Sequence, residues 1–394
     1  MTSSSDALTR PPRLPSALDP TTFACTAVLL GLFALHYGVL LGALFELFTA
    51  LDYLVGSRAI DWPWAVRIVL AAAAGLLLAR IAWRLSLSIV GLVTPKYDRP
   101  ASRVSATSLS PDEHPQLFQL VSRVCQRLNA PLPDELRVSP TSECYVIEER
   151  QFSWRTARRL ILVLGLPQLL VLTVAELQVI LAHEMAHFRR GHTTRVVFLY
   201  RFAESLRLAI SRARRRWWRW FDPVYWFCLL IFRLFVLFSA PVQRKQELRA
   251  DCVSAAHYGG DMAVHTLLKD WLLENQFDSA IEEFLDDSQS ESPRLHGSVY
   301  QLFVDRWRDY SAAGEEYLER RLREEERTSF FDPQPTINSR LSAMRSYPAG
   351  SDSDRGESER RQPANLHLDL ATLEKQLHDQ LLRALEPASA RRPA

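Results

Sequence analysis

The stretch that decides the fold is TVAELQVILAHEMAHFRRG, residues 173–191. It opens with a capping box, because the hydroxyl of Thr173 and the carboxylate of Glu176 can satisfy the first free amides of a helix. Gly191 is typical of a residue that stops a helix. The sequence therefore predicts a helix that begins directly after the threonine and ends at about Arg190.

Two histidines stand four residues apart near the end of this helix, as His183-Glu184-Met185-Ala186-His187. Positions four apart lie on one helix face, so both imidazoles can reach one metal ion while the carboxylate of Glu184 projects beside them. The competing interpretation is a surface helix with two solvated histidines, which the capped helix around the motif disfavours. The pattern therefore predicts two metal ligands with an acidic side chain next to them.

A catalytic zinc ion takes three protein ligands and a water, so one ligand must come from elsewhere. Every downstream His, Glu or Asp is a candidate, although His192 is too close along the same helix to serve well. The segment QELRAD, residues 246–251, places Glu247 and Asp251 on one helix face. One carboxylate can bind the metal while the other accepts a hydrogen bond from a ligand imidazole. Alone, this segment indicates a solvated acidic face; after the first motif, it becomes the favoured ligand pair.

Together the two motifs resemble the membrane-bound gluzincin peptidases of the HtpX and CAAX prenyl endopeptidase type, in which the glutamate of Glu-x-x-Ala-Asp is the third zinc ligand. Three further matches extend the resemblance to roughly residues 105–345: HPQL (114–117), GG (259–260) and the stretch 333–341, which ends in Arg340-Leu341. Two positions depart from the family pattern: Glu143-Cys144, where an Asn-Ala pair is usual, and Asp332-Pro333, where His-Pro is usual.

The resemblance implies a zinc metalloendopeptidase with a zincin-like fold, mainly α-helical with a small β-sheet. It implies one Zn²⁺ per chain, bound by His183, His187 and Glu247, with Asp251 behind a ligand imidazole. Zinc would lower the pKa of its water and polarise the scissile carbonyl. Glu184 would act as general base and pass the proton to the leaving amine.

The expected partners are a protein or peptide substrate and membrane lipid. The resemblance implies an edge strand that holds an extended peptide by strand addition, and we expect this edge at Leu160–Gly165. His257, Tyr258 and His296 are candidates for oxyanion partners, although each is more readily explained as a structural residue.

Two apolar stretches, Thr22–Phe48 and Trp62–Val93, predict a transmembrane hairpin, because a bilayer needs about 20 apolar residues. Basic residues flank this hairpin and predict a catalytic domain on the cytoplasmic side of the cell (inner) membrane. A further apolar region, 193–242, either crosses the membrane as a second hairpin or is interfacial or re-entrant. Its arginines favour the interfacial or re-entrant arrangement.

A formal net charge of +2 disfavours nucleic acid as a partner. The five scattered cysteines lack a CxxC pair, which disfavours a disulfide framework or a cysteine-rich zinc site. The chain is expected to divide into five parts: a disordered arm (1–21), the hairpin (22–93), the peptidase domain (105–345), a polar linker (346–363), and an amphipathic helix with its tail (364–394).

Two other functions are weighed against an active endopeptidase that acts on membrane-associated or misfolded proteins. One is a catalytically inactive membrane scaffold of the same fold, which the intact motifs disfavour because inactive relatives usually lose one of these residues. The other is a maturation protease for lipidated C-termini. That function would favour several more spans around a chamber than this chain offers.

Overall fold

The computed structural model shows a mainly helical chain with one small mixed sheet. It describes residues 20–56, 63–93, 106–150, 158–188, 202–203, 205–207, 210–211, 220, 222–288, 297–308, 332–348, 362–365 and 369–385. Of the predicted arm (1–21) only residues 20–21 are described, and of the predicted linker (346–363) only residues 346–348 and 362–363.

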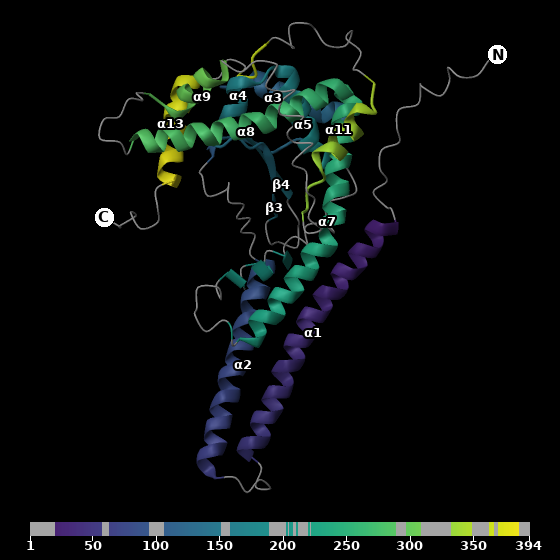
Figure 1. Cartoon of the computed structure of the whole chain (residues 1–394), viewed down its shortest axis with the longest axis vertical. Coiled ribbons are helices and arrows are strands. Elements are labelled where there is room, and N and C mark those ends of the chain that lie inside the picture. Colours follow the sequence, from purple (N-terminus) through teal and green to yellow (C-terminus); the bar gives the residue numbers. More distant parts are fainter. Residues whose placement is uncertain are drawn as a thin grey trace, which may run out of the picture.

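Two long apolar helices, α1 (Pro20–Gly56) and α2 (Trp64–Val93), pack together and extend away from the helical domain (Figure 1). A third helix, α7 (Pro223–Tyr258), packs against α1 with its first half and enters the helical domain with its second half. Among the described residues, these three helices are long and apolar enough to cross a membrane by length and composition. This indicates a membrane-embedded protein, with α1 and α2 in the place of the predicted hairpin.

The region between the two sequence motifs packs on this hairpin wherever it is described. Phe202 and Leu206 join a buried apolar cluster with residues of α1 and α7. Arg80 of α2 pairs with Asp222, directly before α7, at 2.5 Å. Most of residues 193–221 lie outside the described part, so the prediction that this region is interfacial or re-entrant stays a prediction.

The sheet has the strand order β1-β2-β4-β3, formed by β1 (Thr107–Ser108), β2 (Glu135–Ser139), β3 (Tyr145–Arg150) and β4 (Arg158–Gly165). Strand β4 pairs in parallel with β2, where Glu135 lies opposite Ile161, and antiparallel with β3, where Tyr145 lies opposite Val163. The prediction of an edge strand at Leu160–Gly165 is therefore wrong, because β4 is central. Its run of buried apolar residues is typical of a strand covered on both faces. Within the described sheet, β1 and β3 are the two edge strands, and β3 is the one beside β4.

Helix α5 (Val174–Ala186) begins with the predicted capping box. The Thr173 amide donates to the Glu176 carboxylate at 2.7 Å, and the Glu176 amide donates to the threonine hydroxyl at 3.3 Å. The helix ends at Ala186, before the predicted Arg190. The His187 amide donates to the carbonyl three residues back, which tightens the last turn.

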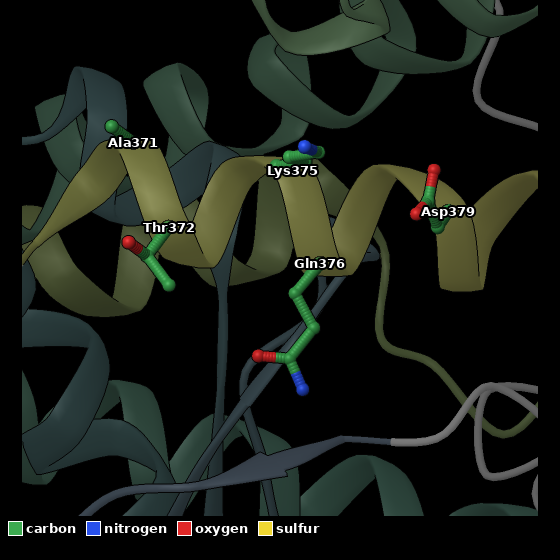
Figure 2. A pocket seen from close by; sticks show the side chains of 5 residues that line it. All are labelled: Ala371, Thr372, Lys375, Gln376 and Asp379. Atoms are coloured by element: carbon green, nitrogen blue, oxygen red, sulfur yellow. The ribbon is translucent and has the colours of Figure 1, made fainter.

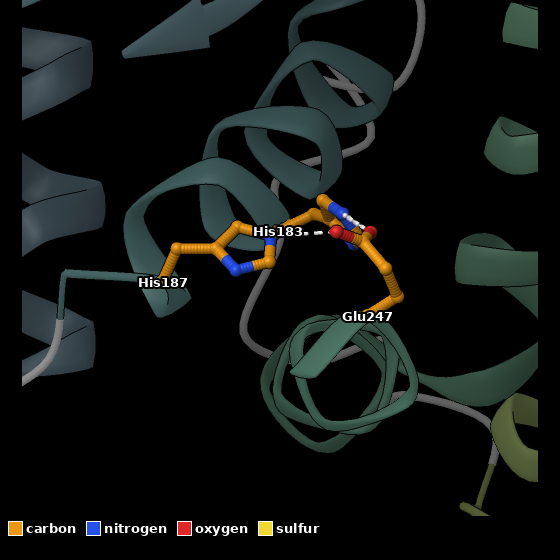
Figure 3. Close-up of side chains that lie close together, drawn as sticks. All are labelled: His183, His187 and Glu247. Carbon is orange, nitrogen blue, oxygen red and sulfur yellow. Dashed lines mark ion pairs between the residues drawn. The ribbon is translucent and has the colours of Figure 1, made fainter. Parts of the chain in front are cut away.

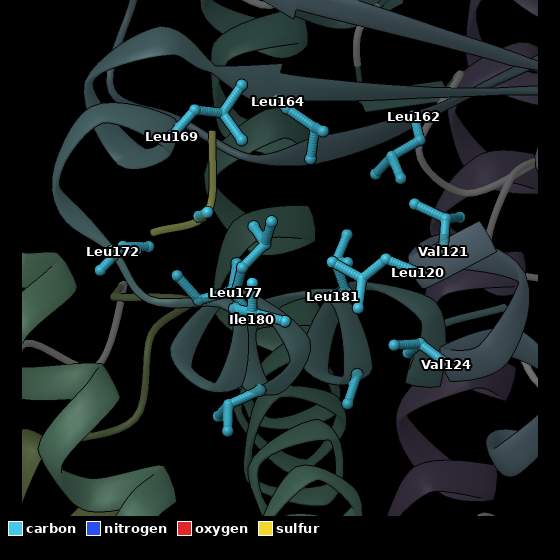
Figure 4. Packing of buried hydrophobic residues seen from close by; sticks show 14 of the residues in the cluster. Leu120, Val121, Val124, Leu162, Leu164, Leu169, Leu172, Leu177, Ile180 and Leu181 are labelled. Atoms are coloured by element: carbon cyan, nitrogen blue, oxygen red, sulfur yellow. The ribbon is translucent and has the colours of Figure 1, made fainter. Parts of the chain in front are cut away.

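The main core surrounds α5, which is buried on nearly every side as expected of a central helix. Figure 4 shows its apolar side chains gathered with those of β4 and of α3 (Pro115–Leu128). The remaining helices cover this core: α4 (Leu166–Val171), α8 (Gly260–Ser288), α9 (Val299–Arg308), α11 (Ile337–Arg345) and α13 (Leu370–Leu385). The last of these matches the predicted C-terminal amphipathic helix, with Leu373, Leu377 and Leu381 buried.

The turn between α7 and α8 requires two glycines. Gly259 has a φ of 91°, which favours glycine, and a Cβ on Gly260 would collide with the backbone carbonyl oxygen of Met344 in α11. This close approach brings α11 against the end of α7, where it can reach the residues of the second motif.

Candidate metal centre

Helices α5 and α7 bring the three predicted metal ligands together (Figure 3). The His183 Nε2 atom lies 3.3 Å from one carboxylate oxygen of Glu247, and the His187 Nε2 atom lies 3.8 Å from the other. The three candidate ligand atoms all lie within 4.8 Å of one another. Within the described part of the chain, no other group of His, Cys, Asp and Glu could hold a metal ion in this way.

The arrangement fits a tetrahedral zinc ion. Zinc bonds of about 2.0–2.2 Å place neighbouring ligand atoms roughly 3.3–3.6 Å apart, close to the two separations found here. Two imidazoles and one carboxylate are also the donor set of catalytic zinc sites that keep a fourth position for water. The residues present therefore suit Zn²⁺.

The electrostatics of the site favour a bound cation. Burial alone would lower the pKa of His183, but its hydrogen bonds to Asp251 and Glu247 raise it to about 10. Burial alone would raise the pKa of Glu247, but His183 and His187 lower it to about 2. The carboxylates thus stabilise positive charge at this position, and a divalent cation would satisfy the same carboxylates.

Asp251 is 2% exposed and joins the metal centre to α11. Its Oδ1 atom lies 3.0 Å from His183 Nδ1, which leaves Nε2 of that imidazole facing the metal position. Arg340 donates two hydrogen bonds to the same carboxylate, at 2.7 and 2.8 Å. The role of Arg340 was missed in the sequence. It belongs to the matched stretch 333–341, but that match gives no hint of a partner 89 residues away.

Glu184 follows the first ligand on α5 and is half-buried. Its charge acts on His183 and also on the thiol of Cys144, whose pKa is raised well above its usual range by burial and then by Glu184 and Asp270. The Glu184 carboxylate is therefore close enough to influence both His183 and Cys144, which directly precedes β3.

The two described candidates for oxyanion partners do not lie at the metal position. His257 and Tyr258 follow Glu247 by nearly three helical turns, about 15 Å along α7. Tyr258 lies in the main core with the Arg127 guanidinium 5.0 Å from its ring centre, so its role is structural. His296 lies outside the described residues.

A surface pocket is also present, on α13 (Figure 2). It is lined by Ala371, Thr372, Lys375, Gln376 and Asp379. These side chains provide one cation and one carboxylate but no metal-ligand group, and the metal ligands are not among the lining residues. We assign this pocket no catalytic role.

Comparison with known proteins places the chain in a family. No curated protein matches it. The model of peptidase family M48 matches residues 111–347, which is more than half of the chain and contains α5, α7 and α11 with all the residues of the centre. The chain therefore belongs to peptidase family M48 and is a metallopeptidase by family.

Proposed function

We propose that this protein is a membrane-anchored zinc endopeptidase of the HtpX and CAAX prenyl endopeptidase type, with Glu184 as general base. The observation that carries this proposal is the convergence of His183, His187 and Glu247 from two helices that are distant in sequence. Bound zinc would lower the pKa of water and polarise the scissile carbonyl.

The chain's own residues supply the rest of the reaction. Glu184 accepts the proton of the attacking water and delivers it to the leaving amine. Asp251 holds His183 in the tautomer that ligates through Nε2, and Arg340 holds Asp251 in turn. The contacts of Asp251 with His183 and Arg340 support the positioning part of this proposal.

A protein substrate would bind in an extended conformation along β3. This strand is an edge of the described sheet and lies against α5, whereas β4 already pairs on both sides. An unpaired strand edge offers free N–H and C=O groups to a peptide backbone. Strand addition at Tyr145–Arg150 would carry the scissile bond past Glu184.

The membrane helices support a substrate class of membrane-associated or misfolded proteins. Helix α7 packs on α1 and also carries Glu247, so the metal centre is tied directly to the hairpin. Arginines and Lys96 on the domain side of the hairpin support a cytoplasmic catalytic domain.

Substitution of the base separates catalysis from metal binding. We expect Glu184→Gln to keep its zinc and to lower the rate of casein cleavage about 10²–10⁴-fold, because only proton transfer is lost. Glu113→Gln, at an exposed site before α3, is the matched control and should cleave as wild type does. Unchanged cleavage by Glu184→Gln would refute the mechanism.

The same assay decides between the alternatives. An inactive scaffold would show no cleavage by the zinc-loaded wild-type protein. A maturation protease would cleave a peptide with a prenylated C-terminus but leave casein intact. Because the described residues provide three candidate spans, too few to enclose a chamber, we expect casein cleavage.

A further inference from the structure

A second group of polar side chains lies beside the metal centre, where three elements meet. A Cβ on Gly165 would lie 2.5 Å from the carbonyl oxygen of Thr141, so the loop before β3 is pressed against the end of β4. Helix α4 follows at once, and its Gln168 donates a hydrogen bond to Asp270 of α8 at 2.6 Å. The loop, α4 and α8 therefore form one continuous wall.

Helix α8, which forms part of this wall, packs against α5, the helix that carries His183 and Glu184. Asp270 is near enough to be influenced by the charges of His183 and Arg340, and both Asp270 and Glu184 act on the thiol of Cys144. Cys144 directly precedes β3. A peptide paired with β3 would pass this wall as it reaches the general base.

The wall is acidic and its carboxylates repel one another. Asp270, Glu274, Asp278 and Glu282 follow at four-residue spacing along one face of α8. Partial burial and then the charges of Glu143 and Asp278 raise the pKa of Glu274. No ion pair within the described residues involves Glu143 or Glu274, and Arg340 already donates to Asp251.

One buried polar atom marks a missing hydrogen-bond donor at the base of this wall. Gln168 is 1% exposed, and its amide nitrogen is bonded to Asp270, but its amide oxygen has no partner among the described residues. A buried unpaired acceptor is costly, and the same amide group is bonded to Asp270, the carboxylate with which a cationic group would pair. A second metal ion is not indicated, because these carboxylates do not form a metal-ligand group.

We propose that Asp270 and Glu274 of α8, with Glu143 from the loop before β3 and Gln168 behind them, form a subsite for an arginine or lysine side chain of the substrate. The inference rests on the proposed function, since it makes these residues selective for peptides that lie along β3. It gives the peptidase a preference for a basic residue close to the scissile bond.

Binding is measured separately from cleavage to test this subsite. Full-length, zinc-loaded Glu184→Gln protein in detergent is titrated with a fluorescein-labelled decapeptide that has a central arginine. A second peptide has citrulline there, which keeps the shape but removes the charge. We expect about tenfold tighter binding of the arginine peptide, because hydrogen bonds to charged groups are strong, with the difference reduced by added salt.

The variants Asp270→Asn and Glu274→Gln should each reduce this preference, and together they should abolish it. Asp261→Asn is the matched control, because Asp261 is exposed on the opposite face of α8 and should leave the preference unchanged. Asn at position 270 can still accept the bond from Gln168, so the fold is kept. Equal binding of both peptides, or a preference that survives the double variant, would overturn the subsite.

Cleavage of the same two peptides by wild-type protein separates the two proposals. Cleavage without preference for arginine would sink the subsite alone. Selective binding of the arginine peptide without any cleavage by the zinc-loaded wild type would support the subsite and sink the peptidase mechanism. If the arginine peptide is neither bound selectively nor cleaved, both proposals are wrong.

Discussion

An aspartate–arginine pair lies at each end of α7, and the two pairs have different surroundings. Near its C-terminal end, Asp251 is 2% exposed, accepts two hydrogen bonds from Arg340 and contacts His183. Directly before its N-terminal end, Asp222 is also 2% exposed and pairs with Arg80 at 2.5 Å. The first pair lies beside the main core, and the second lies where α2 meets α7.

The difference shows what each pair does. Arg340 donates to the two oxygens of Asp251 from Nε and Nη2. This fixes the position of the carboxylate that orients a metal ligand and also balances its charge. The Arg80 guanidinium contacts Asp222 through Nη2 at 2.5 Å and is 34% exposed, while Asp222 also caps α7 through the Tyr225 amide. The pair at the C-terminal end of α7 fixes the position of a metal ligand. The pair at its N-terminal end holds α2 and α7 together.

The largest expected effect comes from breaking the two pairs in parallel. Arg340→Met should lower the free energy of unfolding by about 3–5 kcal/mol, because it leaves a buried charge unpaired. Arg80→Met should cost about 1–3 kcal/mol, since the Arg80 side chain is 34% exposed and water can screen part of this pair. Equilibrium unfolding of both full-length variants in mixed micelles measures the difference. Equal costs would contradict the distinction between the two ends.

Deleting apolar groups tests whether the main core around α5 and the contact between α7 and α1 lie in different solvents. Leu181→Ala removes a side chain that is 0% exposed in the main core and should cost about 2–5 kcal/mol. Ile231→Ala, in the contact between α7 and α1, should cost less than about 2 kcal/mol in a lipid nanodisc, because helices in lipid lose mainly dispersion contacts. A cost for Ile231→Ala as large as for Leu181→Ala would argue that this half of α7 packs in water.

Low pH should lower the free energy of unfolding by protonating Glu176, which caps α5. Burial alone would raise the pKa of Glu176, but the hydrogen bond from His265 and the charge of Lys269 lower it to about 2. This stability is fully present above the ordinary pKa of 4.5 and is lost as pH falls towards 2. Glu176→Gln should therefore lose about 3 kcal/mol at pH 7 and show a flatter acid limb in unfolding curves. An acid limb that keeps its slope in the variant would assign the loss to other groups.

The smallest expected effect concerns zinc affinity. Asp251→Asn should weaken zinc binding about 10–100-fold, because a residue that orients a ligand contributes that much. Asp222→Asn, the matched change at the other end of α7, should leave zinc affinity unchanged. Competition with a fluorescent chelator measures both. A loss of affinity in Asp222→Asn would mean that the hairpin end also positions the metal ligands.

Local patterns were enough to predict where α5 begins and that its two histidines lie on one helix face, but not that the helix ends at Ala186. The capping box at Thr173 and the spacing of His183 and His187 depend on residues within one or two turns, where chain geometry is known in advance. Glu247 needed the resemblance as well, because an acidic residue on a helix is by itself no sign of a metal site.

Contacts between distant elements could not be predicted in this way. The position of β4 within the sheet depends on which strands flank it. Its run of apolar residues indicates a central strand only once both of its faces are known to be buried. The bond from Arg340 to Asp251 depends on how closely α11 approaches Gly260. Asp270 is one of four acidic residues at four-residue spacing on α8, and its bond from Gln168 depends on how α4 packs against α8.

The most direct test of the metal centre is anomalous diffraction at the zinc edge from crystals of the full-length protein. We predict a single peak bounded by Nε2 of His183, Nε2 of His187 and the carboxylate of Glu247. No peak at this position, or a Glu247 carboxylate turned away from a metal held by other residues, would contradict the assignment.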